Sequence, residues 1–310
     1  MLKPAAGAAA AFALASAVLA APAGRVSTTA AAVCEFRAIA AQHPDPKLRN
    51  PDTLAAKFCE PVQLPREYDA AREVIDDDPE AYAGYFYVNA RTRHVDAHLR
   101  DAVAAGATQV VVLGAGFDSR AYRFHHAYPR LAFFEVDLPA TIDAKMQAVR
   151  RVFGALPGHV HYAPIDFNTQ SLDGVLGAAG YDAARKTLFI LEGVTMYVSA
   201  SGIGSTFDFI RDHAPAGSRA VFDYVLRRVV EGDYEGLYAA SKTAKGVARA
   251  GEPFVTGWTP AEAAAFAARH GLKVRDDLDG AELARRYLTG SGGRPDGRVP
   301  AWYHVIDATR

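Results

Sequence analysis

Short apolar segments alternate with amphipathic segments over the last two thirds of the chain. The apolar segments are rich in β-branched and aromatic residues, a composition typical of buried strands. They cover residues 109–113, 131–139, 159–167, 186–197, 219–226, 271–278 and 300–308. Helical patterns lie between them, near Ala121, through Ile142 and Val149, over 201–213 and after Thr259. This alternation predicts an α/β fold with a doubly wound, parallel or mostly parallel sheet.

The residues before this region predict a helical unit. Ser27 and Thr28 can cap a first helix, because their hydroxyl oxygens accept hydrogen bonds from free N–H groups of a first turn. Prolines at 44 and 46 break that helix, and Asp52 is placed to cap a second short one. A longer amphipathic helix ends at Gly106. The predicted divisions are an extension (1–24), a helical cap (25–106) and a core (107–310) with a polar, irregular insertion (227–253).

Residues 1–24 contain one lysine, an alanine-rich run and the small-residue sequence Ala21-Pro22-Ala23. That order is typical of an export signal. The run is too weakly hydrophobic to predict a stable membrane span. An export signal, a membrane tether and a start placed too far upstream all stay open from this segment alone.

Composition and spacing exclude some classes of partner. The 34 basic and 35 acidic residues nearly cancel and form no basic stripe, so we expect no nucleic-acid partner. Cys34 and Cys59 lack metal-ligand spacing; a disulfide between them is possible, but two buried thiols are expected. Two pairs of nearby histidines occur, His125 with His126 and His159 with His161. Neither pair has a third ligand at a metal-binding spacing, so no metal site is predicted.

The stretch QVVVLGAGFDSR (109–120) carries the first functional signal. Gly114 and Gly116 follow its apolar strand and allow a ligand to lie against the backbone at the strand's carboxyl end. Later predicted strands end at Asp137, Asp166 and Glu192. Because parallel strands end at one edge of the sheet, these acids and the glycine turn predict one shared pocket.

Two classes of nucleoside ligand compete for this pocket. A dinucleotide needs G-x-G-x-x-G, but Ser119 stands at the third glycine position and Asp118 lies inside the loop. A carboxylate there repels a pyrophosphate. S-adenosyl-L-methionine (SAM) has the same ribose, no phosphate and a cationic sulfonium, so an acidic pocket favours SAM. An NAD(P)-dependent oxidoreductase and a non-catalytic SAM-binding protein stay open as alternatives.

Several longer motifs bear a family resemblance. LGAGFDSRAYR, FFEVDLP and LEGVTMY, with STTAAAVCEFRA and ARTRHVD before them, resemble the leucine carboxyl methyltransferase family, specifically its bacterial branch of SAM-dependent methyltransferases. The resemblance extends from about residue 27 to the last strand. It implies a class I SAM-methyltransferase (Rossmann-like) sheet with an N-terminal helical cap.

The resemblance also implies cofactor contacts. It places Gly114 and Gly116 along the methionine part of SAM and Asp137 at the ribose hydroxyls. It places Asp166, with Phe167 beside it, at the adenine.

Further implied contacts surround the charged end of SAM. Glu192 lies near the methionine or sulfonium end, and Arg91 pairs with the carboxylate, with Arg37 as a possible assistant. Arg91 and Arg93 could instead form a solvated helix face. The residues Asp118 and Arg120 could simply pair with each other or cap the following helix.

Methyl transfer from SAM needs alignment and exclusion of water. A carboxylate acceptor needs no base, whereas a hydroxyl acceptor does; the sequence shows no compelling base, and the family resemblance agrees with a carboxylate. Tyr197 and Arg91 are the candidates to hold a small-molecule acceptor, although Tyr197 could be a core aromatic. The insertion 227–253 is expected to select the acceptor. Since SAM is held in the cytosol, we expect a cytoplasmic enzyme, with export or tethering through 1–24 as the alternative.

Overall fold

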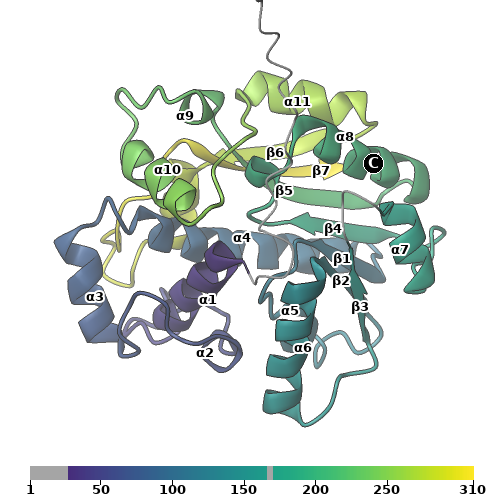
Figure 1. Ribbon diagram of the computed structural model, residues 1–310, viewed down its shortest axis with the longest axis horizontal. Helices are drawn as coiled ribbons and strands as arrows, with labels where there is room; N and C mark the ends of the chain where they lie inside the picture. The colour runs from purple at the N-terminus through teal and green to yellow at the C-terminus, as the bar shows by residue number, and fades with distance from the viewer. Residues whose placement is uncertain (1–26, 166–169) are drawn as a thin grey trace, which may run out of the picture.

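A seven-stranded sheet lies at the centre of the computed structural model, which describes residues 27–165 and 170–310 (Figure 1). The strands are β1 (Gln109–Leu113), β2 (Ala132–Asp137), β3 (Val160–Pro164), β4 (Thr187–Leu191), β5 (Arg219–Val225), β6 (Lys273–Asp279) and β7 (Tyr303–Thr309). Their order across the sheet is β3-β2-β1-β4-β5-β7-β6. The first five strands pair in parallel, and β7 pairs antiparallel with both β5 and β6. The predicted doubly wound, mostly parallel sheet is confirmed.

Helices cover both faces of the sheet. They are α1 (Thr28–Ala40), α2 (Ala55–Phe58), α3 (Tyr68–Asp77), α4 (Ala83–Ala104), α5 (Arg120–Arg123), α6 (Pro139–Phe153), α7 (Leu172–Ala178), α8 (Ala200–His213), α9 (Arg227–Val230), α10 (Ala240–Arg249), α11 (Pro260–Arg269), α12 (Gly280–Tyr287) and the 3-10 turn η1 (Thr195–Tyr197). Within the described ranges, no helix is both long enough and apolar enough to cross a membrane.

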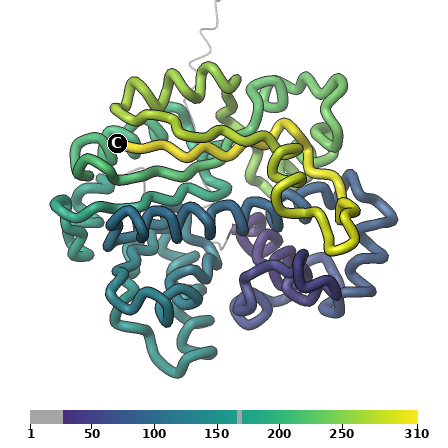
Figure 2. Tube along the Cα trace, turned by 180° about the vertical axis from the view of Figure 1, so that it is seen from behind, coloured from purple at the N-terminus to yellow at the C-terminus, as the bar shows by residue number. Residues whose placement is uncertain are grey.

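The strand β1 shows how the two apolar layers form. Successive side chains of a strand point to opposite faces. Val110 and Val112 join the layer that includes α4 and α12, whereas Val111 and Leu113 join the layer of α7, α8 and α11. Figure 2 shows α4, in blue, lying across its face of the sheet. Both faces of β1 are therefore buried, which explains its unbroken apolar sequence.

Of two expected helix caps near the N-terminus, one is present and one is not. The Ser27 hydroxyl caps α1 by accepting from the Ala30 N–H at 3.1 Å, as predicted. Asp52 does not cap α2, whose N-cap residue is Leu54. The Asp52 carboxylate is buried and instead accepts from Arg37 Nε at 2.8 Å, because an ion pair is what keeps a carboxylate stable there.

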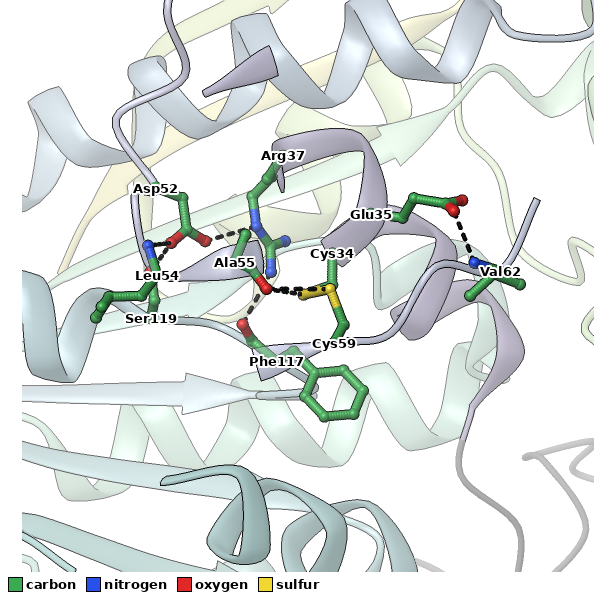
Figure 3. The surroundings of a disulfide bond; sticks show 10 residues. All are labelled: Cys34, Glu35, Arg37, Asp52, Leu54, Ala55, Cys59, Val62, Phe117 and Ser119. Carbon is green, nitrogen blue, oxygen red and sulfur yellow. Dashed lines mark hydrogen bonds and ion pairs between the residues drawn. A yellow bond between two sulfur atoms is a disulfide. The ribbon is translucent and has the colours of Figure 1, made fainter. Parts of the chain in front are cut away.

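The expectation of two free thiols is wrong. Cys34 on α1 and Cys59 after α2 form a disulfide, with their Cα atoms 6.3 Å apart (Figure 3). The loop between the two short helices folds back and brings the cysteines together, and α1 packs on α2. No pattern in the sequence predicts that the chain folds back at this point.

The insertion 227–253 is more regular than predicted. It contains α9 and the ten-residue helix α10, which faces α1 across the open end of the sheet (Figure 1). Helices α3, α7 and α12 were also absent from the sequence prediction. They are short, with ten, seven and eight residues, so each offers only about two to three turns from which a periodic pattern could be recognised.

Candidate functional site

A cavity of about 460 Å³ opens at the carboxyl ends of β1, β2 and β4, and α1 and α10 close it from the other side. This is the position where doubly wound sheets bind ligands. The predicted site residues that line it are Arg91, Gly114, Gly116, Asp137, Glu192 and Tyr197. The remaining two, Asp166 and Phe167, lie outside the described residues.

The glycine turn after β1 is fixed by backbone conformation and by Asp137. Gly114 has φ +67°, and a Cβ atom there would collide with Val194. The Gly116 N–H donates to Asp137 Oδ2 at 2.7 Å, and the Leu138 N–H donates to Oδ1 at 2.7 Å. Burial raises the pKa of Asp137, against these two backbone donors. The turn and the end of β2 therefore form one rigid wall of the cavity.

Glu192, just after β4, lies between two arginines. Its carboxylate is 3.1 Å from Arg91 Nε and 2.7 Å from Arg120 Nη1. Burial acts to raise the pKa of Glu192, but Arg120 and Arg91 outweigh it and lower that pKa. Glu192 therefore carries a negative charge at neutral pH.

Arg91 is buried, so the solvated-face alternative is wrong for it. Its guanidinium also pairs with Asp223 on β5. The solvated-face alternative fits Arg93 no better, since its guanidinium donates to the backbone carbonyls of Lys47 and Arg49. The helix α4 thus directs Arg91 into the cavity wall and Arg93 toward the N-terminal loop.

Asp223 on β5 is a site residue that the sequence pattern did not predict. Its Oδ1 accepts from the Gly193 N–H at 2.7 Å, and its Oδ2 accepts from the Tyr87 hydroxyl at 2.8 Å and from Arg91. Gly193 has φ +71°, and Arg91 Nη1 lies 3.3 Å from where a Cβ would stand. An acid in the middle of the apolar strand VFDYV was the available signal, because a buried carboxylate requires partners.

Asp118 and Arg120 bind each other, as the sequence allowed. Asp118 Oδ1 accepts from the Arg120 N–H at 2.6 Å, and their side chains form an ion pair. Arg120 also donates to Asp96 on α4 at 2.8 Å. Burial opposes it, but Arg120 and Lys145 lower the pKa of Asp118 to about 2.

Arg37 joins the N-terminal helices to the glycine turn. Its Nη2 donates to the Phe117 carbonyl at 2.8 Å, while Nε binds Asp52 (Figure 3). The Ser119 hydroxyl donates to the other oxygen of Asp52 at 2.5 Å. Arg37 also lines the cavity, so it is a second arginine available to an anionic group there.

The side of the cavity away from the sheet is mostly apolar. Tyr197 packs on Phe254 with ring centroids 5.5 Å apart, and Val88, Val247 and Tyr303 lie around them. Burial raises the pKa of the Tyr197 hydroxyl, so it remains protonated at neutral pH. It is therefore available as a hydrogen-bond donor.

Glu252 joins the segment after α10 to the start of α1. Its carboxylate accepts from the Ser27 hydroxyl at 3.0 Å, the Thr28 N–H at 3.1 Å and the Thr29 hydroxyl. All four residues line the cavity. This contact closes the cavity between α1 and α10.

Glu135 does not face the cavity. It is fully buried beneath the glycine turn, with Lys145 Nζ 2.8 Å from its Oε1. Lys145 also lies 3.5 Å from the Ala115 carbonyl. Burial raises the pKa of Glu135 to about 7, although Lys145 opposes that shift.

Comparison with known proteins identifies the family of this chain. Residues 30–211 match the model of the leucine carboxyl methyltransferase family. A protein of Mycolicibacterium paratuberculosis named "Putative S-adenosyl-L-methionine-dependent methyltransferase" is 30% identical over 269 residues, covering 84% of this chain and 83% of that protein. A Bacillus subtilis protein with the same description is 32% identical over 197 residues, which are 61% of this chain and 62% of that protein. The match thus spans less than two thirds of the Bacillus protein.

Among solved structures, a DUF574 family protein from Streptomyces avermitilis superposes with a TM-score of 0.58. The two chains are 15% identical, and the superposition covers 92% of this chain and all of that one. That likeness supports the fold alone.

Proposed function

Because this chain belongs to the leucine carboxyl methyltransferase family, we propose that it transfers the methyl group of SAM to an oxygen of a small acceptor, a carboxylate first of all. Methyltransferase activity with SAM as the cofactor agrees with the relatives and with the position of the cavity. The chemical class of the acceptor is inferred from the residues that line the cavity.

The charges around the cavity fit SAM. SAM carries a carboxylate, an ammonium and a sulfonium, so its site needs both signs of charge. Arg91 and Arg37 supply positive charge for the carboxylate, and Glu192 supplies negative charge for the cationic end. We assign Asp137 to the ribose hydroxyls and the turn of Gly114 and Gly116 to the methionine chain. Asp166 and Phe167 remain the predicted adenine contacts.

The family and the acidic cavity argue against the oxidoreductase alternative. Asp118, Asp137 and Glu192 all line the cavity, whereas a pyrophosphate needs hydrogen-bond donors around it. SAM has no phosphate and is not subject to that repulsion.

One observation favours a carboxylate acceptor. The acidic residues among the described lining are Asp118, Asp137, Glu192 and Glu252, and each already accepts hydrogen bonds or ion pairs from at least two donors. No histidine belongs to that described lining. A hydroxyl acceptor requires a base to take its proton, and among the described lining residues no carboxylate or histidine is free for that role. A carboxylate attacks the methyl carbon directly.

The other requirement of the reaction is that the protein position the acceptor and exclude water. Tyr197 is protonated and can donate a hydrogen bond to an acceptor oxygen. The apolar wall of Val88, Val247 and Phe254 excludes water and leaves a carboxylate poorly solvated, which strengthens its attack. In-line displacement then releases S-adenosylhomocysteine.

Binding and product chemistry test the proposal separately. Calorimetry should show binding of S-adenosylhomocysteine and none of NADH; the reverse result would sink the methyltransferase assignment. Incubation with methyl-labelled SAM and a panel of carboxylic acids and phenols should give a product that releases labelled methanol in mild base, as esters do. A base-stable product would instead identify a hydroxyl acceptor.

A further inference from the structure

Two histidines and one aspartate converge away from the cofactor cavity. His94 and His98 lie one turn apart on α4, and Asp276 lies on β6. One ligand atom of each residue lies within 4.8 Å of the others. None of the three lines the cavity described above. The methyl-transfer chemistry therefore leaves this cluster unexplained.

The two imidazoles point their Nε2 atoms at the same place. These atoms are 3.0 Å apart, and the rings meet edge to face with centroids 4.3 Å apart. Histidines four residues apart on a helix lie on one face, which is the spacing that metal-binding helices use. Burial lowers the pKa of both side chains, so both imidazoles are neutral at physiological pH.

The outer nitrogen of each ring has a partner that orients it. His94 Nδ1 is 3.0 Å from the Tyr287 hydroxyl on α12. His98 Nδ1 accepts from Arg219 Nη2 at 2.8 Å, and Asp307 Oδ2 on β7 lies 3.6 Å from it, beyond hydrogen-bond distance. Metal-binding histidines characteristically give their second N–H to a carboxylate, a carbonyl or a water, and such partners fix the ring that binds the metal.

We propose that His94 Nε2, His98 Nε2 and the Asp276 carboxylate bind a divalent first-row transition metal of the Zn²⁺ or Co²⁺ type. Two imidazole nitrogens and one carboxylate oxygen form a three-residue set that leaves a fourth, tetrahedral position for water. The harder ions Mg²⁺ and Ca²⁺ prefer oxygen-rich sets and would bind weakly here.

Binding requires one rearrangement. Arg219 Nη2 lies 2.8 Å from His98 Nδ1, which therefore accepts, and the His98 hydrogen is on Nε2. The metal replaces the contact between the two Nε2 atoms, and that hydrogen moves to Nδ1, facing Asp307. Arg219 gives up its contact with His98 but keeps its two hydrogen bonds to Asp307, at 3.0 and 2.6 Å.

The position gives the ion access and a structural role. The Asp276 side chain is 30% exposed, whereas His94 is buried, so the carboxylate marks the solvent side. Arg286 is 3.6 Å from one Asp276 oxygen and is also held by Glu282. An ion bound here joins β6 to α4 and stabilises the folded state, because the unfolded chain lacks the assembled site.

Cobalt provides the direct test. Metal-free protein is titrated with Co²⁺ and followed by visible absorption, and its unfolding temperature is measured with and without Zn²⁺. We expect one equivalent of Co²⁺ with the intense absorption of a four-coordinate ion, and a higher unfolding temperature with Zn²⁺. Absence of stoichiometric binding, or a six-coordinate spectrum only, overturns the proposal.

Matched variants locate the site. H94Q and D276N should each weaken Co²⁺ binding tenfold or more and abolish the Zn²⁺ shift. H125Q is the control, because His125 stacks on His159 elsewhere, with ring centroids 3.6 Å apart. Unchanged binding in H94Q and D276N, or loss in H125Q, contradicts the site. If H94Q does not fold, D276N decides alone, since Asp276 is partly exposed. Calorimetry with S-adenosylhomocysteine checks that each variant is folded.

Discussion

Asp223 binds Arg91 and the Gly193 N–H at the same time, and so fixes the cavity-side guanidinium relative to the turn after β4. Arg91 belongs to α4 and Asp223 to β5, at a sequence separation of 132 residues. The Tyr87 hydroxyl donates to the same carboxylate. The Arg91 guanidinium is therefore positioned before any cofactor arrives.

This relationship predicts the effect of D223N. The amide cannot neutralise Arg91, and its NH₂ group faces donors, so Arg91 and the turn should shift. We expect binding of S-adenosylhomocysteine to weaken by about 2 kcal/mol, or roughly 30-fold in Kd, by calorimetry. D277N is the control, because Asp277 also accepts from a tyrosine, Tyr224 at 2.9 Å, but lies outside the cavity lining. Equal loss in both variants would contradict a specific role.

Tyr197 should affect the acceptor rather than the cofactor. Y197F removes one hydroxyl donor and keeps the ring that packs on Phe254. We expect kcat/KM for the acceptor to fall roughly tenfold, the usual loss for one neutral hydrogen bond, while Kd for S-adenosylhomocysteine stays unchanged. A loss confined to cofactor binding would show that Tyr197 contacts the cofactor and not the acceptor.

The Cys34–Cys59 disulfide should stabilise the N-terminal helices. It closes a loop with a separation of 25 residues, for which the loss of unfolded-state entropy predicts about 3.5 kcal/mol. Reduction of the wild type should lower the free energy of unfolding, measured in urea, by that amount. The double variant C34S/C59S should be equally unstable and insensitive to reductant.

The same bond should influence the cofactor site. It joins α1 to α2, and Arg37 on α1 holds the Phe117 carbonyl of the glycine turn (Figure 3). We expect reduced protein to bind S-adenosylhomocysteine several-fold more weakly. An unchanged Kd would show that the disulfide does not influence the cofactor site. Disulfides are rare in the cytosol, so this bond stands against the cytoplasmic location that the cofactor suggests.

Glu135 predicts a specific dependence of stability on pH. Its pKa is raised from an ordinary value of 4.5 to about 7, first by burial. The folded state therefore holds this proton more tightly than the unfolded chain. The stability that protonated Glu135 adds to the folded state is fully present below about pH 4.5 and is lost as the pH rises through 7.

The variant E135Q isolates the pH dependence that comes from Glu135, because glutamine does not titrate. The difference in unfolding free energy between wild type and E135Q should change by on the order of 3 kcal/mol between pH 4.5 and 7, in disfavour of the wild type at the higher pH. Urea titrations at several pH values measure it. Asp118 and Glu192, with lowered pKa values, act in both proteins and cancel. Parallel stability curves would show that Glu135 keeps an ordinary pKa.

The sequence by itself determined the elements that depend on neighbouring residues. The apolar run before Gly114 predicted β1 because both faces of a central parallel strand are buried. Acids at strand ends predicted a common pocket, since parallel strands end at one edge, and Asp137 and Glu192 both line it. Ser27 predicted a helix cap through purely local hydrogen bonding.

Only the tertiary structure decided which distant residues meet. Asp223 reaches Arg91, Cys34 reaches Cys59 and Glu252 reaches Ser27 because separate elements pack together, and no periodicity along the chain encodes those pairings. A buried charge must find a partner, but the identity of that partner is set by the folded chain. Local patterns thus predicted the sheet and the glycine turn, whereas long-range packing closed the cavity and assigned its charges.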